Sequence, residues 1–175
     1  MKYQLYNKRI FLFSGFTLVE LIVVIAVLGI LAGIVLVALN PLEHIAKATD
    51  GRTKQSVSQV GGSLSSFYSQ KQTFPTVDSD WMDELITNGD LSDRPPQAPE
   101  LCNPSAALDS NFCLQVSGNG AVVYSQLTSQ GENSRCSTES DVAYFLFDTI
   151  RGRGCLVCGA TTDTFSPGET CVAEN

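Results

Sequence analysis

The six cysteines of this sequence have a residue type and a spacing that could support disulfide formation or metal binding. An even number of cysteines in a small domain outside the reducing cytosol is typical of disulfides, whereas Cys155 and Cys158 also have the spacing of two zinc ligands. No second pair with this spacing exists, and Gly159 stands where a haem-attachment motif needs histidine. In an extended strand, Cys155 and Cys158 would lie about 10 Å apart at their Cα atoms, too far to bond to each other. We therefore expect disulfides among Cys102, Cys113, Cys136, Cys155, Cys158 and Cys171. Cys102–Cys113 is the most local pair, and the other pairings stay open.

The other titratable residues do not form a catalytic set. His44 is the only histidine, and its place in a polar helical stretch favours a hydrated side chain over a metal ligand. Four acids lie close together in the sequence: Asp78, Asp80, Asp83 and Glu84. Helix capping or a solvated helix face explains them, and calcium binding is the alternative. No nucleophile-elbow, phosphate-loop or metalloprotease motif is present. The sequence thus predicts neither an enzyme nor a cofactor.

Charge is distributed unevenly along the 175 residues, whose net charge is −7. The first 15 residues carry Lys2, Lys8 and Arg9 and no acid, whereas most acids lie beyond residue 49. The acidic balance argues against a protein whose main task is to hold nucleic acid. The length fits one domain with an appendage.

A long apolar segment is that appendage. Residues 21–39 contain no charge, and a bilayer core needs about 20 apolar residues. All the early positive residues precede the segment, which predicts that the N-terminus stays inside and the remainder is exported. A cleaved signal peptide would have a shorter apolar region and a small-residue cleavage site, which is not found here. Gly29 and Gly33 have the GxxxG spacing that lets two membrane helices approach closely, although glycine is also common in such helices.

Glu20 stands near the start of this apolar segment. An acid inside a membrane span is costly and is a candidate functional residue by default. A glutamate close enough to the interface to stay hydrated would need no function. The energetic argument alone leaves both interpretations open.

The residues around Glu20 carry a resemblance to a known family. Residues 15–26 read GFTLVELIVVIA, which resembles the N-terminal signature of type IV pilins and type II secretion pseudopilins. The resemblance implies that a prepilin peptidase cuts between Gly15 and Phe16 and that the new N-terminal Phe16 is N-methylated. Residues 1–15 would then be a discarded leader, and the mature side chains would carry a charge of −10 once its three positive charges are removed from −7.

The same resemblance implies a role for Glu20 and a set of partners. In a filament, the Glu20 carboxylate would pair with the N-terminal amine of Phe16 of a neighbouring subunit. The implied partners are further copies of the chain and other pilins, the peptidase, the platform protein of the assembly machinery and its ATPase. The implied location is the inner membrane, as a single-pass protein with an exported head, and then the cell surface as a pilus.

The sequence beyond the apolar segment predicts a helix and a sheet. Apolar residues recur at three- and four-residue steps from residue 42 to residue 68, which predicts that one long helix of about 80 Å runs from Phe16 to Ser69 and packs its second half on the head. We expect Asn40-Pro41 to allow a kink. Predicted elements of the head are a short helix over Trp81–Thr87 capped by residues 78–80, a polar surface loop over 128–140, and strands over 112–116, 121–127, 142–150, 155–161 and, as a last edge, 165–172.

These observations predict an α+β, pilin-like fold. The expected organisation is a leader (residues 1–15), a transmembrane or filament-core helix (16–39), an amphipathic helical half (40–72) and a disulfide-containing head (73–175). Two alternatives to a pilus subunit stay open. One is a pseudopilin or a minor or competence pilin, and the other is an anchored domain that binds a ligand and does not polymerise.

Overall fold

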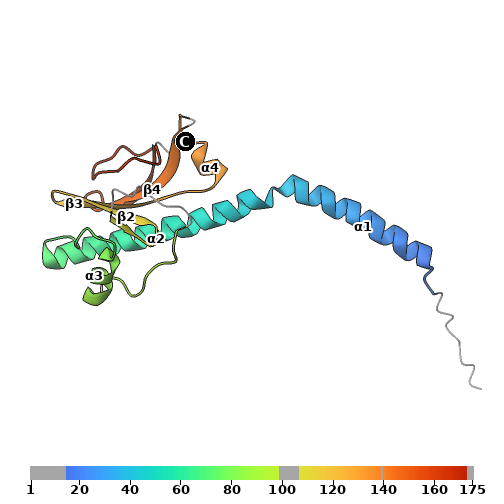
Figure 1. Cartoon of the computed structure of the whole chain (residues 1–175), viewed down its shortest axis with the longest axis horizontal. Coiled ribbons are helices and arrows are strands. Elements are labelled where there is room, and N and C mark those ends of the chain that lie inside the picture. Colours follow the sequence, from blue (N-terminus) through green and yellow to red (C-terminus); the bar gives the residue numbers. More distant parts are fainter. Residues whose placement is uncertain (1–14, 99–106, 139, 173–175) are drawn as a thin grey trace, which may run out of the picture. The chain divides into compact units, whose positions relative to one another are not determined.

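Two consecutive helices begin the part of the chain that the structure describes. The structure is a computed structural model that describes residues 15–98, 107–138 and 140–172 (Figure 1). Helix α1 spans Leu18–Leu39 and helix α2 spans Pro41–Lys71. The chain divides into two compact units, and the boundary lies between Pro41 and Leu42.

The predicted long helix is not continuous, because it is interrupted at Asn40, in the Asn40-Pro41 pair where the sequence predicted a disturbance of the helix. This residue adopts a left-handed conformation, with φ 39° and ψ 67°, and it caps the C-terminal end of α1. A residue before proline is disfavoured in the right-handed helical region, and asparagine tolerates the left-handed one. Pro41 then occupies the first position of α2, where its missing N–H costs no hydrogen bond.

Helix α2 packs on the head with only part of the predicted apolar stripe. The buried residues Val57, Val60 and Leu64 are fully enclosed in the main core cluster. Leu42 and Ile45, which the pattern assigned to the same packed face, are 77% and 64% exposed. Near its N-terminal end, α2 instead contacts the head through charged side chains, which we describe below.

Gly61 sits where α2 comes closest to the sheet. A Cβ added at this glycine would lie 2.2 Å from two ring atoms of Phe147 and 2.7 Å from its Cβ. At the neighbouring Gly62, an added Cβ would meet nothing within 4 Å. The sequence pattern treated both glycines as helix-weakening, whereas the structure gives Gly61 a packing role.

The short helix α3 spans Trp81–Asn88 and ends at Gly89, whose φ of 84° suits glycine. Asp80 occupies the N-cap position, but its side chain makes no capping hydrogen bond. The expected cap from residues 78–80 is thus wrong, because the N–H of Met82 donates to Oδ2 of Asp109 at 3.3 Å instead. Asp109 also pairs with Arg94, so a side chain of the sheet helps to hold the start of α3.

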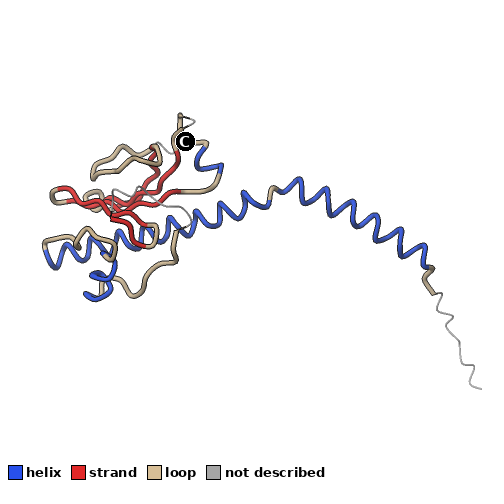
Figure 2. The backbone as a smooth tube through the Cα atoms, in the orientation of Figure 1, coloured by secondary structure: helices blue, strands red, loops and turns tan. Residues whose placement is uncertain are grey.

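Five antiparallel strands form one sheet in the order β1-β2-β3-β4-β5, so each strand pairs with its neighbours in sequence (Figure 2). The predicted α+β, pilin-like fold class is confirmed. The strands are β1 (Ala107–Asp109), β2 (Phe112–Ser117), β3 (Gly120–Gln126), β4 (Val142–Asp148) and β5 (Arg153–Gly159). Strand β1 was not predicted, because it is only three residues long and turns into β2 at Ser110 and Asn111, which have φ 53° and 65°.

The sheet is covered on both faces. On one face, Leu114, Ala121 and Val123 join the core cluster that includes residues of α2 and α3. On the other face, Phe165 packs against Tyr124 and Tyr144, with ring centroids 5.0 Å from each.

The segment that carries Phe165 is not the edge strand that the pattern predicted over residues 165–172. It forms turns, with Pro167 followed by Gly168 at φ 93°, and a proline and a left-handed glycine interrupt strand geometry. Only the N–H of Val172 donates to the carbonyl of Leu156 in β5, at 2.8 Å.

Candidate processing and assembly segment

Residues 15–17 lie outside regular secondary structure and lead directly into α1. Phe16 is 79% exposed, and a Cβ added at Gly15 would meet no atom within 4 Å. Thr17 is extended, with φ −78° and ψ 149°. Gly15 and Phe16 are therefore exposed and lie outside the helix.

Thr17 caps α1, a feature that the sequence reasoning missed. Its Oγ1 accepts a hydrogen bond from the N–H of Glu20 at 3.2 Å. Threonine followed three residues later by glutamate is the spacing of a capping box, so the signal was present in the sequence. Glu20 thus occupies the first helical turn, where the helix dipole favours a negative charge.

The Glu20 carboxylate has no cationic partner within the described chain. Its side chain is exposed, and none of the ion pairs among residues 15–98, 107–138 and 140–172 involves it. The structure therefore leaves this acid available for a partner from outside the chain.

Helix α1 has no covering layer of its own. The window Leu18–Val35 has a mean hydropathy of 3.0, long and apolar enough to cross a membrane, and none of it is buried in the protein. Added Cβ atoms at Gly29 and Gly33 would meet nothing within 4 Å. The close packing predicted for these two glycines stays a prediction, since it requires another molecule.

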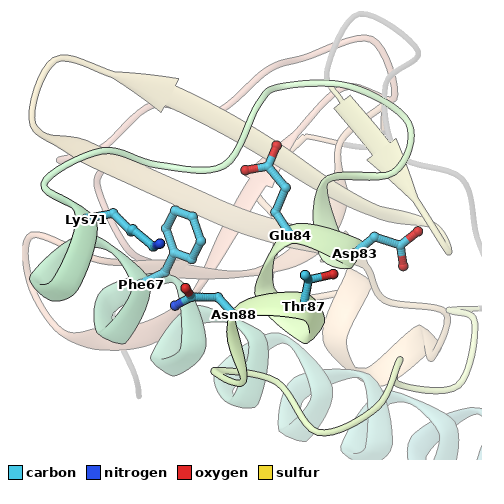
Figure 3. Close-up of a pocket in the computed structure, with 6 residues that line it drawn as sticks. All are labelled: Phe67, Lys71, Asp83, Glu84, Thr87 and Asn88. Carbon is cyan, nitrogen blue, oxygen red and sulfur yellow. The ribbon is translucent and has the colours of Figure 1, made fainter.

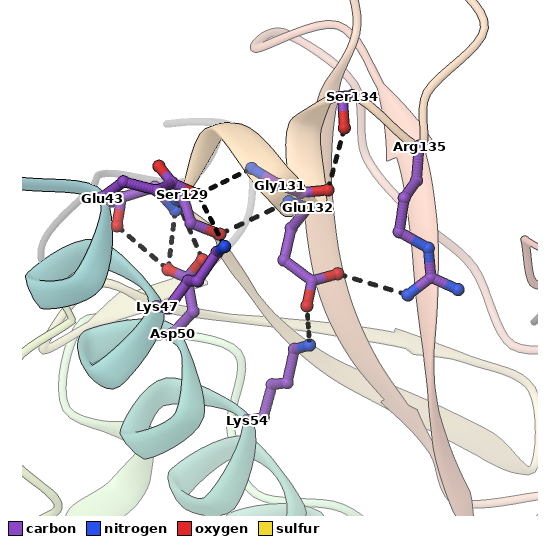
Figure 4. A network of polar contacts seen from close by, with 10 residues as sticks. Glu43, Lys47, Asp50, Lys54, Ser129, Gly131, Glu132, Ser134 and Arg135 are labelled. Carbon is purple, nitrogen blue, oxygen red and sulfur yellow. Dashed lines mark hydrogen bonds and ion pairs between the residues drawn. The ribbon is translucent and has the colours of Figure 1, made fainter. Parts of the chain in front are cut away.

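A polar contact fixes the first turns of α2 against the head (Figure 4). We call it the α2 clasp. It joins Glu43, Asp50 and Lys54 on α2 to residues 128–132, which include the start of the short helix α4 (Gln130–Asn133). Lys47 pairs with Glu43 within α2, at 3.6 Å. The sequence predicted only a surface loop here, although Ser129 and Glu132 have capping-box spacing and the Oγ of Ser129 accepts from the N–H of Glu132 at 3.4 Å.

Asp50 is the buried centre of the α2 clasp. Its side chain is 2% exposed. Oδ1 accepts from the N–H and the hydroxyl of Thr128 at 2.7 and 3.0 Å, and Oδ2 accepts from the N–H of Ser129 at 2.9 Å. These three donors compensate for the removal of the carboxylate from water, which would otherwise be strongly unfavourable.

Two further acids complete the α2 clasp. Glu43 accepts from the N–H groups of Gly131 at 3.0 Å and Gln130 at 2.9 Å. These backbone hydrogen bonds, with a smaller effect of nearby Lys47, hold the pKa of Glu43 below its ordinary value. Glu132 in turn pairs with Lys54 at 2.5 Å. The first turns of α2 are thus attached by charges and backbone amides, not by apolar packing.

Two acids of the cluster in the head, Asp83 and Glu84, line an open cavity of about 530 Å³ between α2 and α3 (Figure 3). Asp83 pairs with Arg94 at 2.8 Å, and Glu84 accepts from the N–H of Thr76 at 3.0 Å. Asp78 accepts from the N–H of Asp80 at 3.0 Å. Within the described ranges, no group of three or more potential ligands could hold a metal ion. These contacts give Asp78, Asp83 and Glu84 structural roles.

Disulfides connect the last strand to two flanking segments. Cys136 bonds to Cys158, and Cys155 bonds to Cys171. Cys155 and Cys158 both lie in β5 and each bonds elsewhere, as strand geometry requires. Cys113 is also disulfide-bonded, but Cys102 lies outside the described residues, so the Cys102–Cys113 pair stays a prediction. His44 is exposed on α2, which suits a hydrated side chain.

Comparison with known proteins identifies the class of this segment. Residues 12–36 match the family model described as the prokaryotic N-terminal methylation motif. Searches of curated proteins and of solved structures returned no match.

This motif is the prepilin signature of type IV pilins and pseudopilins, and it lies on an α+β, pilin-like architecture. The chain thus carries the N-terminal signature of type IV pilin and pseudopilin precursors at the start of an apolar helix.

Proposed function

We propose that this protein is a structural subunit of a type IV pilus or pilus-like filament. A prepilin peptidase hydrolyses the Gly15–Phe16 bond, the freed amine of Phe16 receives a methyl group from a methyl donor, and the chain polymerises through α1. The position of the methylation motif supports this proposal. The motif includes the exposed Gly15 and Phe16, which lie directly before an apolar helix that no other part of the described chain covers. An exposed surface of this kind needs lipid before assembly and neighbouring helices after it.

Glu20 has the position required of an assembly residue. Once α1 leaves the membrane and packs among other helices, its carboxylate needs a cation. A singly methylated amine still carries a positive charge at neutral pH, so Phe16 of a neighbouring subunit can supply it. At about 4 Å and an effective dielectric near 20, two such charges attract by roughly 4 kcal/mol before the cost of desolvation is subtracted. A contact of this size can set the register between subunits.

Two measurements test the proposal. Mass spectrometry of the mature chain should find a methylated Phe16 at its N-terminus. A non-methylated terminus, or one at another residue, would contradict the processing step and favour an anchored domain that does not polymerise. Electron microscopy with a probe for this subunit should then find surface filaments. Correct processing without surface filaments would favour a pseudopilin or a minor pilin over a major one.

Substitution of Glu20 tests the assembly role. We expect Glu20→Ala to insert in the membrane and to be cleaved normally but to yield few filaments, because the amine of Phe16 loses its partner. Glu20→Asp keeps the charge and serves as the matched control, with a filament yield between those of the wild type and Glu20→Ala. A normal yield from Glu20→Ala would refute the ion pair.

A further inference from the structure

The Cys155–Cys171 disulfide lies at a cavity beside the last strand of the sheet. The cavity has a volume of about 330 Å³. Its lining residues are Arg153, Gly154, Cys155, Leu156, Cys171 and Val172. Four of these residues belong to β5, which stands at one end of the strand order. The cavity therefore gives a molecule in solution a route to this disulfide.

The guanidinium of Arg151 faces one of the two sulfur atoms. Its Nη1 donates to Sγ of Cys171 at 3.5 Å, whereas Asp148 pairs with Nε, on the other side of the group, at 3.7 Å. Arg153 lines the same cavity and adds a second positive charge. A cation next to a sulfur stabilises its thiolate, and in thiol–disulfide exchange the sulfur that forms the more stable thiolate leaves faster. Cys171 is therefore the preferred leaving group, and Cys155 is the sulfur that an incoming thiolate attacks.

The Cys136–Cys158 disulfide has different electrostatic surroundings. Its cysteines are half-buried, as are those of the Cys155–Cys171 disulfide, so exposure alone does not separate the two bonds. Within the described ranges, no lysine or arginine donates a hydrogen bond to its sulfur atoms, and the adjacent Arg135 pairs with Glu132 at 3.3 Å instead. Only one of the two bonds thus has a cation placed to stabilise a departing thiolate.

Noncovalent contacts hold the segment around Cys171 in place when its disulfide opens. Arg151 donates to the backbone carbonyl oxygens of Glu169 at 2.5 Å and of Gly168 at 2.9 Å. The N–H of Gly168 donates to Oδ2 of Asp148 at 2.9 Å. Because these contacts do not depend on the disulfide, the reduced cysteine stays close to its partner. Opening of this bond is therefore reversible without unfolding of the head.

We propose that the Cys155–Cys171 disulfide is an exchange site at which a dithiol protein of the thiol–disulfide oxidoreductase class acts on this head. A thiolate of that protein attacks Sγ of Cys155, and the electron pair of the broken S–S bond leaves on Sγ of Cys171, which Arg151 stabilises until it takes up a proton. The second thiol of the dithiol protein then attacks that protein's own sulfur in the mixed disulfide. Cys155 is released with the proton of that thiol, and the dithiol protein leaves as a disulfide. Two electrons have then passed to the head, and the reverse sequence closes the bond.

The order in which the disulfides open tests this proposal. The full-length chain in detergent is treated with limiting dithiothreitol at neutral pH, its thiols are alkylated, and mass spectrometry locates them. We expect the Cys155–Cys171 bond to open at least about tenfold faster than the Cys136–Cys158 bond. Arg151→Gln should slow the opening of the first bond at least about threefold, and Arg151→Lys, which keeps the charge, should restore most of the rate. Arg135→Gln, the matched control beside the second bond, should leave both rates within about twofold of wild type.

A trapped mixed disulfide identifies the sulfur that is attacked. After brief exposure to reduced glutathione and an acid quench, we expect the adduct mainly on Cys155. Equal opening rates of the two bonds, faster opening in Arg151→Gln or an adduct mainly on Cys171 would each overturn the proposal. These results concern the chemistry of the head and leave the proposed filament function intact, whereas a missing cleavage after Gly15 would overturn that function and leave the exchange site intact.

Discussion

Gly61 and Gly62 are adjacent in α2, and replacing each with alanine should change stability in opposite directions. Alanine is favoured over glycine in a helix by about 1 kcal/mol, and this gain applies to both positions. At Gly62 an added Cβ meets nothing within 4 Å, so the gain is realised in full. At Gly61 the added Cβ would lie 2.7 Å from the Cβ of Phe147. Because that atom is fixed to the backbone of β4, rotation of the ring cannot relieve the clash, and α2 or β4 must move.

Overpacking of this kind typically costs about 1–3 kcal/mol. We therefore expect Gly61→Ala to be less stable than Gly62→Ala by about 1–3 kcal/mol, with Gly61→Ala at or below wild type and Gly62→Ala above it. The assay is urea unfolding of the full-length chain in detergent, followed by the fluorescence of Trp81. This is the only tryptophan of the chain, and it is fully buried in the core cluster that contains α2 residues. Equal stabilities of the two variants would refute the close approach of α2 to Phe147.

Two further predictions concern the α2 clasp. Asp50→Ala should lower the free energy of unfolding by about 2–4 kcal/mol, because it leaves two buried or half-buried backbone N–H groups without an acceptor. The urea unfolding assay measures this loss, and a value below about 0.5 kcal/mol would contradict the prediction. Glu43 has a pKa lowered from 4.5, so its contribution is present above about pH 5 and is lost as the pH falls through the lower, folded-state pKa. Glu43→Gln should therefore reduce the thermal midpoint at pH 7, and the difference from wild type should shrink between pH 5 and pH 3. A constant difference across this range would show that the carboxylate charge is not responsible.

Short-range patterns account for the parts of the fold that were predicted. The uncharged run of residues 21–39 predicted α1 without reference to any other part of the chain, because its composition and length are local properties. The turn at Gly118-Asn119 and the helix from Trp81 to Gly89 followed from residues whose backbone preferences act within a few positions. Local signals were also missed, since Thr17 with Glu20 and Ser129 with Glu132 both have capping-box spacing.

The errors arose where residues far apart in the sequence meet. The apolar stripe predicted that Leu42 and Ile45 pack on the head, but the partner of this part of α2 is a polar segment about 80 residues later, and periodicity cannot reveal which face a distant segment will contact. The cap of α3 came from Asp109 in β1 for the same reason.

The sequence by itself determined the membrane-length helix, the methylation motif over residues 12–36 and the position of Glu20, because each depends only on residues that follow one another in the chain. Only the tertiary structure decided what α2 does beyond Asn40. Its rotation about its own axis is set by hydrogen bonds from Asp50 to Thr128 and Ser129 and by the close contact of Gly61 with β4. Both depend on how the chain folds back on itself, and the exposure of Leu42 and Ile45 is the consequence.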